Sequence, residues 1–386
     1  MTLASHLRCG ALGEWFRAGS LDHAALADRV GDALRGRVPL RSARRSTAGH
    51  RALVQAIVRA RLGLVVQHAP PYRALVGAHR LGLAPRRELH ELAARFPSHT
   101  GLSEGRRRTA LRWRPAGPGW LDVGDPLSPG RPVPRGRDGR VARVVATELE
   151  LLDAWAPPGR LADPATERQL AAMCAVTAGW AAGVPAAPRH GPPAGDKAGP
   201  FLPAAAQDEA AELVALACEA GILTRLHRCA GRPGAGLALG TADAVFVPRW
   251  AEGGTVIGPG TGGSGPALLV DVVTPADPLR DLGRLHGWCH HLLARAWLDA
   301  PDRHGVTHVG LYFARHGALA TWPLDELAAA TARDDRAARN PFLELARRAA
   351  TADGVVLRAP RASSTADDRG ARRASSLGSD NILCMT

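Results

Sequence analysis

The amino-acid sequence predicts an α/β protein in which a helical N-terminal domain precedes a domain built around a β-sheet. Apolar residues recur at helical spacing between residues 20 and 95, which is typical of amphipathic helices. Further along, apolar runs bounded by glycines and capping residues follow the order helix, strand, strand, strand, helix, strand (αβββαβ). A chain of 386 residues with this apolar content is long enough for two or three domains with separate cores.

The helical, basic domain is predicted for residues 1–113. Its clearest helix ends before Pro70 and Pro71, because consecutive prolines interrupt a helix. Residues 114–162 are predicted as a linker or surface excursion, since proline, glycine and arginine dominate the segment 114–143. The apolar stripe of the helix consists of Leu53, Ile57, Val58, Leu62 and Val65.

The α/β domain is predicted for residues 163–331. It opens with a helix at 163–183, for which Asp163 and Pro164 are a suitable N-cap and first residue. After it we predict a helix at 207–220, strands at 222–228, 242–248 and 267–274, a helix at 280–298 and a strand at 306–313. This last strand is expected to form a hairpin with residues 319–322.

A helix and a disordered tail are predicted after residue 331. Residues 332–358 are expected to form a C-terminal helix. Residues 359–386 contain few large apolar side chains, so burial cannot offset the entropy cost of ordering them, and we expect a disordered tail.

The chain contains no apolar run of the roughly 20 residues that span a bilayer, and its six cysteines are scattered. Both features favour a cytoplasmic protein with reduced thiols and no membrane association.

Two aspartates lie on neighbouring predicted strands, Asp243 in TADAVFV and Asp271 in LLVDVVT. Such carboxylates can bind a hard divalent cation that activates water for phosphodiester hydrolysis. The pattern resembles the PD-(D/E)XK, or restriction-endonuclease-like, nuclease superfamily over roughly residues 165–330. The segments 270–293 and 308–327 also resemble bacterial proteins with nuclease-like cores. The resemblance implies an αβββαβ core with a mixed sheet, and Asp243 and Asp271 as catalytic, Mg²⁺-binding residues. The alternative is that one of these aspartates ends or caps a strand and the other pairs with an arginine.

The residue that this family uses as its catalytic lysine is missing. The family places the lysine two positions after the second acid, and here that position is Val273. The only lysine of the chain, Lys197, lies in a loop well before the predicted core. Arg280, Arg284 or His286 could approach the same site from the following helix, but arginine does not act as a general base. The sequence therefore favours a catalytically impaired relative over an active nuclease.

Two histidines of the helix at 280–298 have the spacing of a helical metal pair. His286 and His290 are four residues apart, with Cys289 and His291 adjacent, so two imidazoles on one face could bind zinc or another transition metal. The alternative is a partly exposed helix with incidental histidines.

The glycine-rich run from residue 258 to residue 265 lacks a P-loop lysine and precedes a strand, which favours a hairpin loop over a phosphate cradle.

The positive charge of the chain lies in its first part. Residues 1–150 contain 26 arginines and 12 acidic residues, a net charge of +14, whereas residues 151–386 have a net charge of −1. A dense basic cluster with one aromatic residue can neutralise phosphates and stack a base. A solvated basic surface is the alternative, because 48 of the 49 basic residues are arginine, which is typical of a GC-rich genome. The cluster consists of Arg106, Arg107, Arg108, Arg112, Trp113 and Arg114, and Arg41, Arg44 and Arg45 form a second one.

Three functions are compatible with these patterns. The favoured one is a degenerate nuclease-like protein that binds nucleic acid, or a partner complex, through its arginine-rich front. The second is an active Mg²⁺-dependent DNA endonuclease or exonuclease in which a displaced basic residue replaces the lysine. The third is a non-catalytic interaction module whose basic part binds an acidic protein.

Overall fold

The computed structural model describes nine stretches of the chain: residues 3–19, 22–42, 47–97, 139–182, 204–222, 255–257, 267–299, 305–331 and 335–353. Several predictions concern residues outside these stretches: Asp243, Lys197, the basic cluster at 106–114, the strand at 242–248, nearly all of the strand at 222–228 and the tail at 359–386. No helix in the described stretches is long and apolar enough to cross a membrane.

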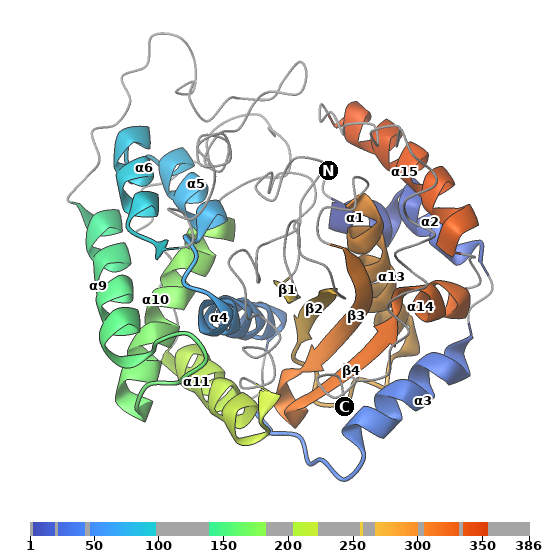
Figure 1. The fold of residues 1–386 in the computed structure, drawn as a ribbon, viewed down its shortest axis with the longest axis horizontal. Helices are drawn as coiled ribbons and strands as arrows, with labels where there is room; N and C mark the ends of the chain where they lie inside the picture. The colour runs from blue at the N-terminus through green and yellow to red at the C-terminus, as the bar shows by residue number, and fades with distance from the viewer. Residues whose placement is uncertain are drawn as a thin grey trace, which may run out of the picture.

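A mixed four-stranded sheet forms the centre of the molecule (Figure 1). Strand β2 (Ala267–Val273) pairs in parallel with β3 (Val306–Phe313), and β3 pairs with β4 (Ala318–Pro323) as an antiparallel hairpin. These three strands confirm the ones predicted at 267–274, 306–313 and 319–322. The fourth strand, the short β1 (Thr255–Ile257), pairs antiparallel with β2 and was not predicted from the sequence.

Helix α13 (Leu282–Leu298) connects the two parallel strands, which need such a crossover because a tight turn can join only antiparallel neighbours. Its start is fixed by Asp281, whose side chain accepts a hydrogen bond from the backbone N–H of Arg284 at 3.0 Å. The predicted helices at 163–183 and 207–220 are also present, as α10 (Pro164–Ala182) and α11 (Ala204–Glu219).

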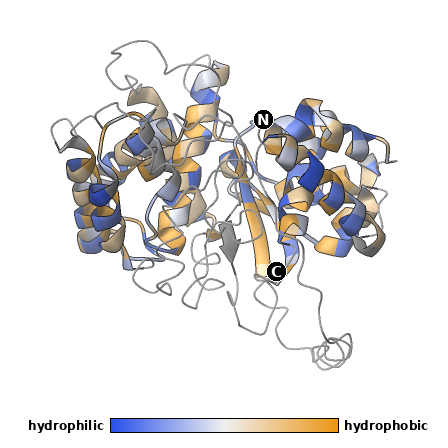
Figure 2. Cartoon of the chain, turned by 90° about the horizontal axis from the view of Figure 1, so that it is seen from above, coloured by the Kyte–Doolittle hydropathy of each residue, from blue (hydrophilic) through white to orange (hydrophobic). Residues whose placement is uncertain are grey.

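Helices cover both faces of the sheet (Figures 1 and 2). Leu269 and Val273 of β2 belong to one core, together with residues of α13, α14 (Leu324–Ala330) and α15 (Asp335–Ala352). Leu268 and Val270 face the opposite core, which α10, α11 and α4 (Ala48–Val66) complete. This division follows from strand geometry, in which successive side chains point to opposite faces.

The helices of the predicted N-terminal domain pack into three different cores. The first three, α1 (Leu3–Cys9), α2 (Ala11–Arg17) and α3 (His23–Leu34), contribute to the core shared with α13 and α15. Helix α4 belongs to the opposite sheet face. Helices α5 (Tyr72–Arg80) and α6 (Arg86–Ala94) form a third core, away from the sheet, with α9 (Arg140–Trp155) and Trp180 of α10. The boundary at residue 113 stays a prediction.

Residues 140–155 of the predicted linker form a helix instead, the 16-residue α9. The composition of the preceding segment, rich in proline, glycine and arginine, obscured this helix. Its signal is nevertheless present, because four buried apolar residues recur at spacings of four, four and three: Val141, Val145, Leu149 and Leu152.

Candidate functional site

Asp271 lies on the central strand β2 and is only 5% exposed. The antiparallel pairing with β1 ends at Val270, so Asp271 is the first residue of β2 beyond that partner. Helix α4 covers the strand at this point, since Gln55 Nε2 donates a hydrogen bond of 2.7 Å to the carbonyl of Val272. The candidate site therefore lies where α4, β2 and α13 meet.

Both carboxylate oxygens of Asp271 are engaged by arginines. Arg59 Nη2, from α4, lies 2.5 Å from Oδ1, and Arg295 Nη1, from α13, lies 3.1 Å from Oδ2. The backbone N–H of Val272 also donates to Oδ1 at 2.9 Å. Burial raises the pKa of Asp271, but the two guanidinium groups outweigh it and lower the pKa to about 2. The side chain is therefore an ionised, fully paired carboxylate at neutral pH.

This arrangement does not fit a Mg²⁺ ion at Asp271. The cation needs carboxylate oxygens as ligands, and here each oxygen already has a guanidinium partner. Val273, at the position where the resembling nucleases have a lysine, is 0% exposed and packs in the core around α13. No group of three or more His, Cys, Asp or Glu side chains is arranged to hold a metal ion in the described stretches. Asp243 lies outside them.

The other arginines expected near this site lie just before the start of α13 or in its first turn. Arg280 and Arg284 are exposed around the start of α13, and the guanidinium of Arg284 lies over the Trp288 ring at 5.3 Å from its centroid. The arginines that do reach Asp271 were not identified from the sequence. The sequence does contain a signal for Arg295, because it is the one charged residue in the apolar run from Leu292 to Leu298.

His286 and His290 are both buried on α13, at 5% and 8% exposure. The imidazole of His290 stacks on the ring of Phe16 from α2, with centroids 4.4 Å apart and planes 17° apart. Its Nε2 is buried and has no hydrogen-bond partner among the described residues. Burial, together with the charges of His286 and Arg17, lowers the pKa of His290 to about 4. This environment is that of a neutral core histidine.

Acid should destabilise the fold through His290. Its pKa is about 4 in the folded protein against 6.5 for the free side chain, so the unfolded chain binds the proton first. The stabilisation present above pH 6.5 should be lost as the pH falls toward 4, by about 2–3 kcal/mol. We expect the variant His290→Leu to lose less stability than the wild type between pH 7 and pH 4.5 in urea unfolding. Parallel losses in the two proteins would contradict this role.

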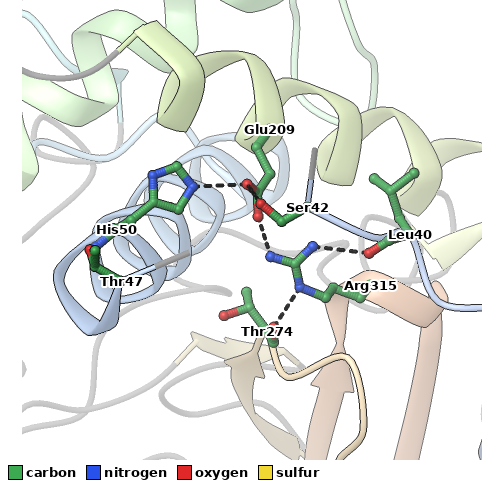
Figure 3. A network of polar contacts seen from close by, with 7 residues as sticks. All are labelled: Leu40, Ser42, Thr47, His50, Glu209, Thr274 and Arg315. Atoms are coloured by element: carbon green, nitrogen blue, oxygen red, sulfur yellow. Dashed lines mark hydrogen bonds and ion pairs between the residues drawn. The ribbon is translucent and has the colours of Figure 1, made fainter. Parts of the chain in front are cut away.

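A second polar network fixes the position of α4 (Figure 3). Arg315, on the short 3₁₀ helix η1 (Ala314–His316), is 3% exposed and uses its guanidinium on three partners. Its Nε donates to the carbonyl of Thr274 at 2.8 Å, its Nη1 donates to the carbonyl of Leu40 at 2.9 Å, and its Nη2 pairs with Glu209 of α11. The network thus joins the end of β2 to α11 and to the chain that leads into α4.

Glu209 completes this network on the side of α4. Its Oε2 accepts hydrogen bonds from Ser42 Oγ at 2.7 Å and from His50 Nε2 at 2.8 Å (Figure 3). Burial raises the pKa of Glu209, but the hydrogen bonds from His50, Ser42 and Arg315 outweigh it and hold the pKa below its usual value. His50 lies in the first turn of α4, so Glu209 anchors the helix that carries Arg59.

Of the two predicted arginine clusters, the structure describes only Arg41. Arg41 is exposed just before α4. Arg44, Arg45 and the basic cluster at 106–114 lie outside the described residues.

Comparison with family models, with curated proteins and with solved structures gave no match.

Proposed function

We propose that this chain is a catalytically impaired PD-(D/E)XK-like protein that binds nucleic acid through its arginine-rich first part. The observation that carries the proposal is the state of Asp271, whose two oxygens are held by Arg59 and Arg295. A carboxylate in this state stabilises the fold and does not bind a cation. The buried Val273 at the lysine position points the same way, because the side chain provides no charge for the developing phosphorane.

Nucleic-acid binding is supported by the charge distribution. The net charge of +14 within residues 1–150 contrasts with −1 in the rest of the chain. Arginines that neutralise phosphates release counterions, so such binding is sequence-independent and weakens steeply with salt. A mixed α/β core with paired, buried charges would then act as the scaffold on which the basic part is held.

Gel retention and cleavage of single- and double-stranded DNA, with Mg²⁺ or Mn²⁺ and across a salt series, test the proposal. We expect retention without metal-dependent cutting. A variant with glutamine at the five arginines of the 106–114 cluster should bind more weakly, with a salt slope smaller by about 0.9 for each arginine that contacts a phosphate. A control of equal charge carries five exposed arginines changed to glutamine elsewhere: Arg35, Arg87, Arg168, Arg280 and Arg348.

Two results would replace the proposal by an alternative. Metal-dependent cutting by the wild type that is lost in Asp243→Ala would identify an active Mg²⁺-dependent nuclease. Absence of retention even at low salt would favour an interaction module for an acidic protein. Equal weakening in the cluster variant and in the charge-matched control would show that net charge, and not the 106–114 cluster, is responsible.

A further inference from the structure

Helix α9 carries a buried glutamate in the middle of its apolar stripe. Glu148 is 2% exposed and lies between Val145 and Leu152, which are fully buried on the same side of the helix. Val145 belongs to the third core, with α5 and α6, whereas Leu152 belongs to the core that α4, α10 and α11 form on one face of the sheet. The carboxyl group of Glu148 therefore lies where these two cores meet.

The contacts of this carboxyl group suit its protonated form. Its Oε1 accepts a hydrogen bond from the thiol of Cys174, on α10, with the sulfur 3.9 Å away. Its Oε2 is buried and has no hydrogen-bond partner among the residues that the structure describes. A thiol is a weak donor, and a carboxylate with so few donors in an apolar interior is strongly disfavoured against the neutral acid.

Neighbouring charges compensate Glu148 only in part. Arg61 of α4 is the cation that acts on it, but this guanidinium already pairs through Nε and Nη2 with both oxygens of Glu167. Helix α6, which also packs against α9, contributes apolar side chains to their shared core, and its Arg87 and Glu91 pair with each other at the surface. Burial raises the pKa of Glu148 to about 7, because it outweighs the opposing charge of Arg61.

We propose that Glu148 is a proton-controlled switch for the packing of α9 against α10. The protonated side chain lets α9 join the third core to the core on the sheet. The ionised side chain requires solvation, which loosens this contact. Residues 98–138, with the arginine cluster at 106–114, connect α6 to α9 in sequence, so the switch acts on the helix that follows this segment. Its relevance to nucleic-acid binding rests on the proposed function, whereas the switch itself does not.

A rise in pH should weaken the packing of α9 selectively. The pKa of Glu148 is about 7 in the packed helix against 4.5 for the free side chain, so the opened form releases its proton first. The stabilisation that is fully present below pH 4.5 is lost as the pH rises to 7. Between pH 5 and pH 8 the equilibrium constant for local opening of α9 should therefore increase on the order of 50-fold.

Amide hydrogen exchange, read by mass spectrometry and corrected for the intrinsic effect of pH on exchange, measures this opening, with β3 as the internal reference. In the wild type we expect the protection of α9 to fall on the order of 50-fold more than that of β3 between pH 5 and pH 8. The difference should vanish in Glu148→Gln and in Glu148→Leu, which provides a second, apolar replacement. Glu150→Gln removes an exposed carboxyl group from the same helix and should behave as the wild type.

Three outcomes would overturn the switch. The first is a pH dependence of α9 protection that is the same in the wild type, Glu148→Gln and Glu148→Leu. The second is a loss of protection in β3 as large as in α9, because the titration would then act on the whole fold. The third is a pH dependence that disappears in Glu150→Gln, which would assign it to the exposed carboxyl group.

Discussion

Replacement of Asp271 by alanine is expected to lower the free energy of unfolding by about 3–5 kcal/mol. The substitution leaves Arg295, whose side chain is 4% exposed, as a buried charge without its carboxylate. Arg59 is better placed to tolerate the loss, because it is 36% exposed and can be solvated. The double variant Asp271→Val with Arg295→Met should recover much of the stability, since apolar side chains of similar size can replace a buried ion pair.

Equilibrium unfolding in urea, followed by circular dichroism, measures this effect, with Asp28→Ala on the exposed side of α3 as the control. Two outcomes are diagnostic. A loss below about 1 kcal/mol in Asp271→Ala would remove the structural role and return Asp271 to the list of catalytic candidates, because functional carboxylates are often held at a cost to stability. A double variant no more stable than Asp271→Ala would show that the carboxylate matters for more than its pairing with Arg295.

The second large effect is expected at Arg61, one of the most buried side chains of the described residues at 1% exposure. Its Nε and Nη2 donate to the two oxygens of Glu167 on α10, at 2.8 and 2.6 Å. It also acts on Glu148 of α9, whose pKa is raised to about 7 because burial outweighs the lowering effect of the Arg61 charge. Arg61→Met removes the cation from two buried carboxyl groups, and we expect a loss of about 3–5 kcal/mol.

A matched control is available at Arg87, which forms an exposed ion pair with Glu91. Arg87→Met should leave the free energy of unfolding within about 0.5 kcal/mol of the wild type. The double variant Arg61→Met with Glu167→Gln should be more stable than Arg61→Met alone, because it removes a stranded charge yet keeps an acceptor for the backbone N–H of Ala162. Equal losses in Arg61→Met and Arg87→Met would refute a buried pairing of α4 with α10.

Three strands of the sheet, β2, β3 and β4, were predictable because they are short apolar runs with clear limits. The runs at Ala267–Val273 and Val306–Phe313 read directly as strands. The three-residue strand β1 was not predictable, because its conformation depends on pairing with β2 and not on its own composition. Helix α9 was missed for a different reason. Its apolar spacing is regular, but the composition of the neighbouring segment dominated the interpretation of the whole range.

The candidate site was predictable only in part. Asp271 could be singled out as a carboxylate inside an apolar strand. Its partner Arg59 could not be predicted, because it lies 212 residues away in sequence, on a helix that looks amphipathic by itself. A charged residue on an apolar helix face can equally well be a surface residue or half of a buried pair. Only the tertiary packing of α4 and α13 against β2 distinguishes the two.

The packing of α1–α3 against the last helices has a consequence for biosynthesis. Asp22 donates its backbone N–H to the carbonyl of Ala330, and His6 pairs with Asp353, 347 residues further along the chain. At a synthesis rate of 5–20 residues per second, the first 34 residues wait on the order of 15 to 60 s before their partners leave the ribosome. Through that interval their apolar side chains, Leu12 and Phe16 among them, are without their native cover. One face of the sheet is therefore completed only after the chain up to Asp353 has left the ribosome.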